Sequence, residues 1–341
     1  MMRKWITVAA AAVLILTGCG NEKDTAERQK EKKTEKSVEE KVVRDPYQFP
    51  LTGKGTKKEA ANRAVAVTVN NHPLARPQSG LHKADIVYEV LAEGNVTRFL
   101  AIFESQKPEK VGPIRSARDY FIDLAKGYDS LYIAHGYSEE AKKMLTRGDI
   151  DSLNGMQYDG TLFKRASFRK APHNSYITFD NIMKGAKAKG YSMKPAPAPL
   201  SFYDKKGAGS ISGQDAMKVK VSYGDPSFTS VYQYDENKAK YSRMTDGEEI
   251  EDLDSGKPVM IENLFIVEAT HSVSDNEGHK DIDLESGGRA YLVQKGKMNE
   301  VEWRNAGGRI LPFVDGSEAA FVPGRTWISI VPSLGAASLE N

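Results

Sequence analysis

The sequence has almost no cysteine, since Cys19 is the only one among 341 residues. A disulfide within the chain is therefore excluded, and a packed apolar core must stabilise the fold instead. The chain is long enough to form such a core, because about 280 residues remain once an N-terminal signal and a polar leader are set aside.

The sequence also lacks a strong net charge. Its 48 lysines and arginines nearly balance 46 aspartates and glutamates, which leaves a net charge of +2. No broad positive field attracts nucleic acid, so we expect no nucleic-acid partner. There is no internal repeat, no glycine-rich phosphate loop with its lysine and no Gly-x-Ser-x-Gly motif. We therefore expect no cofactor.

The apolar run at residues 5–16, broken only by Thr7, is too short to span a bilayer as a permanent helix. Basic residues at 3–4 precede it and small residues follow, a layout typical of a secretory signal. The stretch LTGC at residues 16–19 resembles the lipobox of bacterial lipoproteins. This resemblance implies that the Cys19 thiol receives diacylglycerol, with acyl chains such as palmitate, and becomes the new N-terminus.

On this hypothesis the protein is anchored at Cys19 to the outer face of the cytoplasmic membrane, which is its membrane partner. The acylated Cys19 leaves no thiol for catalysis. The alternative is an ordinary secretory signal in which the cysteine is incidental.

Changes in composition divide the chain into four parts. Residues 1–19 are the signal peptide with its lipobox, and residues 20–57 are a polar segment that we predict to be a flexible tether. A charged helix is the alternative for this segment. Residues 58–199 form an N-terminal α/β domain, and residues 200–335 form a C-terminal β-rich domain.

The N-terminal domain mixes strand and helix patterns. Ser116 and Asp119 fit a capping box before a helix with apolar residues at 121, 124, 125 and 128, and Ser138 fits the cap of a helix over 139–145. Alternating or apolar runs predict strands at 64–69, 85–90, 98–104 and 131–134. A further helix is predicted at 179–189.

The C-terminal domain contains short strand patterns separated by turns. Strands are predicted at 231–234, 241–244, 259–270, 289–294, 301–304, 319–322 and 327–331. The predicted fold class is therefore α+β, with an N-terminal mixed α/β domain followed by a predominantly β C-terminal domain.

Two arginines stand at the predicted start of the first helix. The helix dipole disfavours cations there, so Arg115 and Arg118 are candidates for binding an anion beside the exposed helix N–H groups. The alternative is structural, with Asp119, Asp123 or another acid pairing with them.

A second basic stretch covers residues 163–174. Arg165 and Arg169 are four apart and would share one face of a helix that Pro172 ends, before the pair His173 and Asn174. This stretch is a candidate second wall of the same cationic cleft. The alternative is a solvated surface.

Three further residues are candidates for catalysis. His135 follows an apolar run and could transfer a proton or donate a hydrogen bond, although a structural role is the alternative. Glu89 or Glu93, at the end of a predicted strand that turns back toward Arg98, could be a general acid at the rim of a pocket. His279, Asp281 and Asp283 predict a surface hairpin rather than a metal site.

Several motifs together carry a resemblance to a family. They are Val69-Asn70-Asn71-His72-Pro73, Ala75 to Leu81, Ala84 to Glu89, Gly112-Pro113-Ile114-Arg115-Ser116-Ala117-Arg118, Ala171-Pro172-His173-Asn174, Trp303 and Gly324 to Ile328. The sequence is similar to the YerB-type lipoproteins of Gram-positive bacteria over nearly the whole mature chain. The resemblance implies a lipid anchor, two domains of unknown function and a place in the cell envelope. It supplies no catalytic residue.

These observations favour a binding role over catalysis. In the favoured hypothesis an arginine-rich cleft binds an anionic or glycan-peptide ligand, or a partner at the membrane surface, through Arg98, Arg115, Arg118, His135, Arg165, Arg169, His173 and Asn174. One alternative is a cell-wall glycan-cleaving enzyme, either a hydrolase or a lytic transglycosylase, with a glutamate as general acid. The other is a structural partner in an envelope protein complex.

Overall fold

A computed structural model describes residues 45–276 and 278–340 of the chain. The signal, Cys19 and the first part of the predicted tether lie outside these residues. Residues 44–341 form one compact unit. It begins with a hairpin of β1 (Tyr47–Gln48) and β2 (Gly55–Thr56), a segment that the sequence analysis assigned to the tether.

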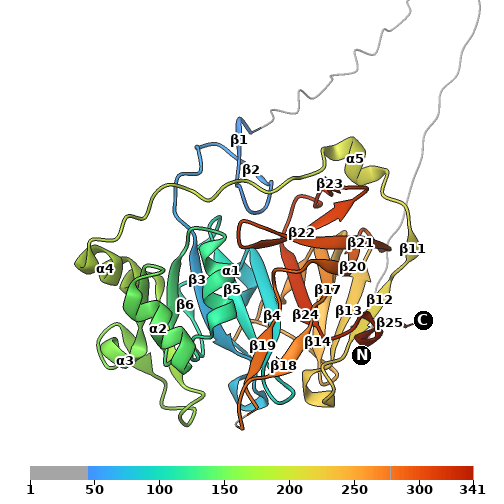
Figure 1. The fold of residues 1–341 in the computed structure, drawn as a ribbon. Helices are drawn as coiled ribbons and strands as arrows, with labels where there is room; N and C mark the ends of the chain where they lie inside the picture. Colours follow the sequence, from blue (N-terminus) through green and yellow to red (C-terminus); the bar gives the residue numbers. More distant parts are fainter. Residues whose placement is uncertain (1–44, 277, 341) are drawn as a thin grey trace, which may run out of the picture. The chain divides into compact units, whose positions relative to one another are not determined.

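One large sheet of twelve strands runs through both halves of the chain (Figure 1). Its path is β23-β22-β21-β20-β17-β24-β4-β5-β3-β7-β8, and β11 pairs with β21. The strands of the first half are β3 (Val65–Asn70), β4 (Ile86–Glu93), β5 (Val96–Phe103), β7 (Leu131–Ala134) and β8 (Ser152–Asn154). Those of the second half are β11 (Gln214–Asp215), β17 (Asn263–Glu268), β20 (Gly288–Gln294), β21 (Lys297–Ala306), β22 (Arg309–Val314), β23 (Ser317–Glu318) and β24 (Thr326–Val331).

The central strands are buried on both faces, which explains why their sequences are nearly continuous apolar runs. Along β3, Val65, Val67 and Val69 pack into one core and Ala66 into the other, as the alternation of side chains requires. The helices α1 (Asp119–Lys126) and α2 (Glu139–Arg147) add to the second core, and α4 (Phe179–Lys189) adds to the first.

A sheet of six strands also packs against the first core. It contains β12 (Lys218–Val221), β13 (Ser230–Asp235), β14 (Lys240–Thr245), β15 (Glu248–Glu249), β16 (Met260–Ile261) and β25 (Ala337–Leu339). Smaller sheets pair β10 (Ser175–Thr178) with β6 (Lys110–Val111) and β9 (Phe163–Arg165), and β18 (His271–Val273) with β19 (Lys280–Ile282). The short helices are α3 (Gly155–Tyr158), α5 (Lys205–Gly209), η1 (Pro73–Ala75), η2 (Leu81–Lys83), η3 (Pro226–Phe228) and η4 (Leu334–Ala336).

The fold class predicted from the sequence is confirmed, with a mixed α/β first half on a large mixed sheet and a mostly β second half. The predicted strand at 131–134 and helix at 179–189 match β7 and α4, and Ser138 caps α2 by accepting the N–H of Ala141 at 3.3 Å. The predicted strand at 319–322 is wrong, because that segment makes only a single bridge, between Phe321 and Phe202.

The predicted capping box at Ser116 is also wrong. The N-cap of α1 is Arg118, in extended conformation, and no side chain caps this helix. The Ser116 hydroxyl instead donates to the backbone oxygen of His135 at 3.4 Å, because residues 113–117 cross the ends of β3 and β7 before the helix begins.

The strand directions create two distinct edges of the large sheet. β3 is parallel to β7 and β7 to β8, β4 is parallel to β24 and β24 to β17, and β5 is antiparallel to both β3 and β4. Six strands therefore end at one edge, the carboxyl edge, and begin at the other, the amino edge.

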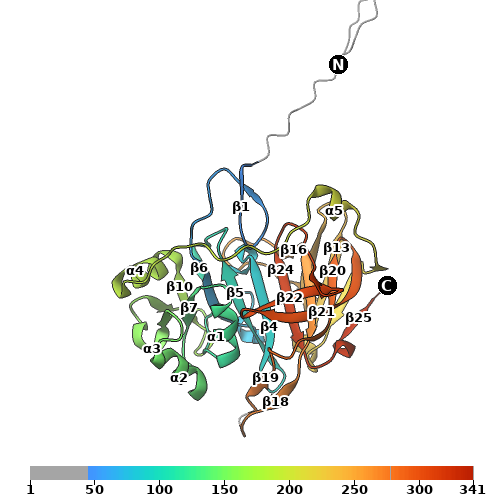
Figure 2. The ribbon, with the colours of Figure 1, turned by 45° about the horizontal axis from the view of Figure 1, so that its top comes forward.

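The β1–β2 hairpin packs at the amino edge. Gly324, just before β24, donates its N–H to the Thr52 oxygen at 2.8 Å, and Lys54 pairs at 2.9 Å with Glu262, just before β17. The β18–β19 hairpin packs at the carboxyl edge, where Gly94 donates to the Gly278 oxygen at 3.1 Å. Figure 2 shows these two hairpins at opposite ends of the sheet. No helix within the described ranges is long and apolar enough to cross a membrane.

Candidate functional site

Most of the predicted site residues meet at the carboxyl edge. Asn70 ends β3, Glu93 ends β4 and His135 directly follows β7. Arg98 lies near the start of the antiparallel β5, opposite Asn70 in the register. Carboxyl ends of neighbouring strands are a common location for ligand sites, because loops there bring side chains from distant sequence positions together. The fold therefore explains why residues spread over more than one hundred positions converge.

Glu93 pairs with two of the predicted arginines. Arg98 donates two hydrogen bonds to its carboxylate, at 2.6 and 2.7 Å, and Arg118 donates a third. Both arginines are buried. Burial alone would raise the pKa of Glu93, but the positive charges of Arg98 and Arg118 lower it below its ordinary value. Glu93 is therefore ionised at neutral pH and lacks the proton that a general acid must supply.

Arg115 is the arginine without a counterion in this group. Its guanidinium makes no ion pair or hydrogen bond to any residue that the structure describes, and its Nε is fully buried. Its backbone is fixed on both sides, since its N–H donates to the Thr68 oxygen at 3.0 Å and its oxygen accepts the His135 N–H at 2.9 Å. Burial lowers the pKa of Arg115, Glu93 opposes this change and Arg118 adds to it. A half-buried cation without an acceptor is costly unless a ligand provides one.

His72 and His173 stack beside Arg115. Their ring centroids are 4.5 Å apart with an interplanar angle of 26°. Burial and the charge of Arg115 lower the pKa of His72, and burial, His72 and Arg115 lower that of His173. The sequence analysis assigned no role to His72, which belongs to the motif Val69 to Pro73. Its position beside His173, 101 residues further along the chain, became visible only in the structure.

His135 is also near Arg115, and burial, Arg165 and Arg115 lower its pKa, while Asp159 opposes this change. Its Nδ1 is 2.7 Å from the Ser175 hydroxyl, and its Nε2 is 2.9 Å from Arg165 Nη2 and 3.9 Å from Asp159. A Cβ on Gly155 would lie 2.2 Å from this ring, so only glycine allows α3 to pack here. Ser175 is buried and the Asp159 carboxylate is paired with Arg165 at 3.0 Å, so the group does not present an accessible nucleophile.

The basic stretch at 163–174 is not a helix. It is the strand β9 followed by a loop, so Arg165 and Arg169 do not share a helix face. Asn174 fixes the loop by donating to the oxygens of Ala166 and Arg169 at 3.3 and 3.2 Å. Arg169 donates to the Tyr176 hydroxyl at 2.6 Å and to the Pro77 oxygen at 2.8 Å. This loop still reaches the carboxyl edge, because Asn70 contacts its His173 at 2.9 Å.

Glu89 is far from the predicted rim position. It is fully buried and forms an ion pair with Arg243 of β14 at 2.9 Å. Asn71, Thr97 and the indole of Trp327 also donate to its carboxylate. This pair joins the first half of the chain to the six-stranded sheet, so Glu89 has a structural environment.

The segment around His279 is the β18–β19 hairpin, as predicted. Its His279 Nε2 lies 3.6 Å from Glu93. Within residues 45–276 and 278–340, no group of three or more potential ligand side chains could hold a metal ion.

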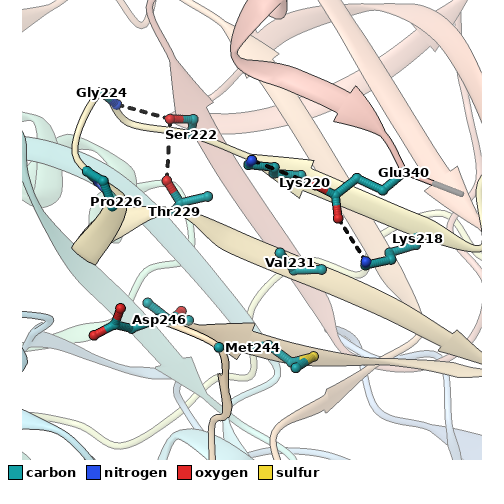
Figure 3. A pocket seen from close by; sticks show the side chains of 12 residues that line it. Lys218, Lys220, Ser222, Gly224, Pro226, Thr229, Val231, Met244, Asp246 and Glu340 are labelled. Carbon is teal, nitrogen blue, oxygen red and sulfur yellow. Dashed lines mark hydrogen bonds and ion pairs between the residues drawn. The ribbon is translucent and has the colours of Figure 1, made fainter.

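A separate hollow of about 660 Å³ lies on the outer face of the six-stranded sheet (Figure 3). Lys218 and Lys220 line it, together with Ser222, Thr229, Val231 and Met244. Both lysines pair with the single carboxylate of Glu340, at 2.9 and 3.7 Å, so each has a counterion nearby. Arg115 lies at the carboxyl edge and not in this hollow.

The fold and the carboxyl-edge cluster define an α+β protein with a basic, histidine-lined candidate binding site. Residues 51–192 match the N-terminal domain, and residues 219–328 the C-terminal domain, of a family described as "Protein of unknown function (DUF3048)". The chain belongs to this DUF3048 family, which confirms the predicted relation to YerB-type proteins.

A relative from Bacillus subtilis is similar to the chain in both sequence and structure. The "Putative lipoprotein YerB" of Bacillus subtilis (strain 168) is 47% identical over 347 residues, which cover 100% of this chain and 99% of the relative. The crystal structure of the YerB protein from Bacillus subtilis superposes with a TM-score of 0.80 at 50% identity, over 86% of this chain and 99% of that chain.

Proposed function

We propose that this protein is anchored by Cys19 to the outer face of the cytoplasmic membrane and binds an anionic ligand at the carboxyl edge through Arg115. The lipobox-like stretch at residues 16–19 and the name of the Bacillus subtilis relative support the anchor. The observation that carries the binding function is the half-buried Arg115 guanidinium, which has no acceptor among the described residues, whereas its neighbours Arg98 and Arg118 both pair with Glu93.

The position of the β1–β2 hairpin favours a ligand on the wall side of the membrane. The anchored chain enters the body through this hairpin at the amino edge, whereas the cluster lies at the carboxyl edge. The hairpin that begins the body and the cluster therefore lie at opposite ends of the sheet, which favours a ligand on the side away from the anchor. Anionic fragments of the cell wall, glycan-peptides among them, are the ligands that this arrangement fits best.

The general-acid hypothesis receives no support from the glutamates. Glu93 is held ionised by two arginines, and Glu89 is buried in its pair with Arg243. Binding without cleavage is therefore the function proposed for the carboxyl edge.

Calorimetric titration with soluble anionic fragments from purified Gram-positive cell walls tests this function. We expect the body, residues 44–341, to bind them and Arg115→Gln to weaken binding about tenfold or more, because a hydrogen bond to a charged group contributes about 1.5 to 3 kcal/mol. Arg304→Gln is the matched control, since Arg304 is half exposed and pairs with Glu302 at 2.8 Å on β21. Equal affinities of the wild type and Arg115→Gln would contradict the proposal.

A further inference from the structure

The backbone fixes which nitrogen of His72 carries the proton. The N–H of Leu74 can only donate, and it points at His72 Nδ1 from 3.2 Å. Nδ1 is therefore the acceptor, and the neutral ring carries its proton on Nε2.

The same reasoning fixes His173 through Asn70. The backbone N–H of His72 donates to Asn70 Oδ1 at 2.9 Å, which identifies the oxygen end of that amide. The other end, Nδ2, must donate, and it lies 2.9 Å from His173 Nδ1. His173 therefore also carries its proton on Nε2.

The cluster consequently offers donors and no free acceptor at its centre. Arg115 has only donors, and the two Nε2–H groups of His72 and His173 find no acceptor within the described part of the chain. The charged groups that face the two rings are Arg76 and Arg115 for His72, and Arg115 and Arg169 for His173. All of them are positive, so they add to burial in lowering the pKa of both rings, which are neutral at pH 7.

We infer that the ligand presents a phosphoryl group, which Arg115 and the Nε2–H groups of His72 and His173 bind together. This inference rests on the function proposed above and names the chemistry of the ligand. Three residues supply the donors, and the guanidinium fork alone can occupy two oxygens. A carboxylate has only two oxygens, whereas a terminal phosphoryl group has three strong acceptor oxygens and more negative charge.

Two probes that carry the same phenyl ring but different anionic groups test which anion the site prefers. Phenyl phosphate and benzoate are titrated separately into the body at pH 7.5 by calorimetry. We expect phenyl phosphate to bind about fivefold or more tightly than benzoate, because one additional hydrogen bond contributes about 1 kcal/mol.

Ring-for-ring substitutions test the role of the histidines. His72→Phe and His173→Phe keep the stacked shape and remove the Nε2–H donors, so each should weaken phenyl phosphate binding about fivefold while benzoate binding changes less. His271→Phe is the control, because His271 lies in β18 and contacts only the Ala269 oxygen through Nδ1. Circular dichroism and the melting temperature confirm that each variant is folded.

The outcomes separate this inference from the proposed function. Benzoate binding as tight as phenyl phosphate binding, with both lost in Arg115→Gln, overturns the phosphoryl inference and leaves the anion site in place. Unchanged phenyl phosphate affinity in both histidine variants also overturns the inference. If neither probe nor any wall fragment binds the wild type, both proposals fail.

Discussion

Two glutamates of one strand, Glu89 and Glu93 of β4, show how a charge buried in the core and a charge at the candidate site differ in this protein. Glu89 faces one arginine, Arg243, and five donated hydrogen bonds from four residues satisfy its carboxylate. Glu93 pairs with two arginines at the carboxyl edge, Arg98 and Arg118. A third arginine, Arg115, has no carboxylate partner among the described residues. The first environment is balanced and closed, whereas the second has an excess positive charge that a ligand can neutralise.

Two arginines show the same difference, because the number of carboxylates near each one, and not its residue type, distinguishes their environments. Arg243 lies over the Trp327 ring at 4.5 Å and is fully buried, so its environment serves the packing of the two halves. Arg115 has part of its surface open and no counterion. Arg243 has a carboxylate partner inside the fold, whereas Arg115 has none among the described residues and can pair with an anionic group of a ligand.

The largest expected effect comes from breaking the buried pair. Glu89→Gln removes the charge that balances Arg243 and should lower the free energy of unfolding by about 3 to 5 kcal/mol, since an unpaired buried charge remains. Urea unfolding followed by circular dichroism measures this change. Glu300→Gln is the matched control, because its pair with Arg289 at 2.7 Å is exposed to solvent and should contribute little to stability. Equal losses in the two variants would refute the difference between closed and open environments.

A third carboxylate, Glu104, sharpens the comparison because it has no cation at all. It is buried, both its oxygens lack a partner among the described residues, and burial followed by the charge of Asp85 raises its pKa to about 8. The folded state therefore keeps a proton that the unfolded chain loses above its ordinary pKa of 4.5. The stability contributed by this proton is lost as the pH rises toward 8, by at most about 1.4 kcal/mol for each pH unit.

Glu104→Gln has no such proton to lose. We expect the melting temperature of the variant to rise relative to the wild type between pH 5.5 and pH 8, because only the wild type is destabilised over this range. Thermal unfolding at several pH values measures the difference, in which all other titrating groups cancel. A difference that stays constant or shrinks with increasing pH would show that Glu104 is ionised in the folded state.

The smallest expected effect comes from releasing the two arginines that Glu93 holds. Glu93→Gln removes the neutralising charge beside Arg98 and Arg118, so anion affinity should rise about threefold to tenfold as the local charge becomes more positive. The same variant should also lose stability, because Arg98 and Arg118 are buried, but less than Glu89→Gln, because Glu93 itself is partly exposed. Titration with wall fragments at low and high salt measures the gain, which salt should reduce. A lower affinity would indicate that Glu93 itself contacts the ligand.

Local patterns predicted most of the fold. The apolar run at 131–134 and the periodic segment at 179–189 depend on neighbouring residues, and both match the structure. The cap at Ser116 was predicted wrongly because residues 113–117 are held by β3 and His135, which are distant in the sequence. The pairing of β4 with β24, which unites the two halves in one sheet, has no local signal.

The residues of the candidate site could be predicted from the sequence, but the ion pairs that they form could not. The sequence pointed to Arg115, Arg118 and His173 because their positions were unusual for local structure. It could not show that Arg118 is paired with Glu93, 25 residues away, and that Arg115 is not. Glu89 was assigned to a pocket rim because its partner, Arg243, lies 154 residues further along the chain.

The most direct test of the Arg115 site is a crystal structure of the body with the wall fragment that binds best in calorimetry. The site predicts an anionic oxygen of the fragment at a hydrogen-bonding distance of about 2.7 to 3.2 Å from the Arg115 guanidinium. A fragment bound elsewhere, with Arg115 still without an acceptor, would contradict the assignment of the carboxyl edge as the binding site.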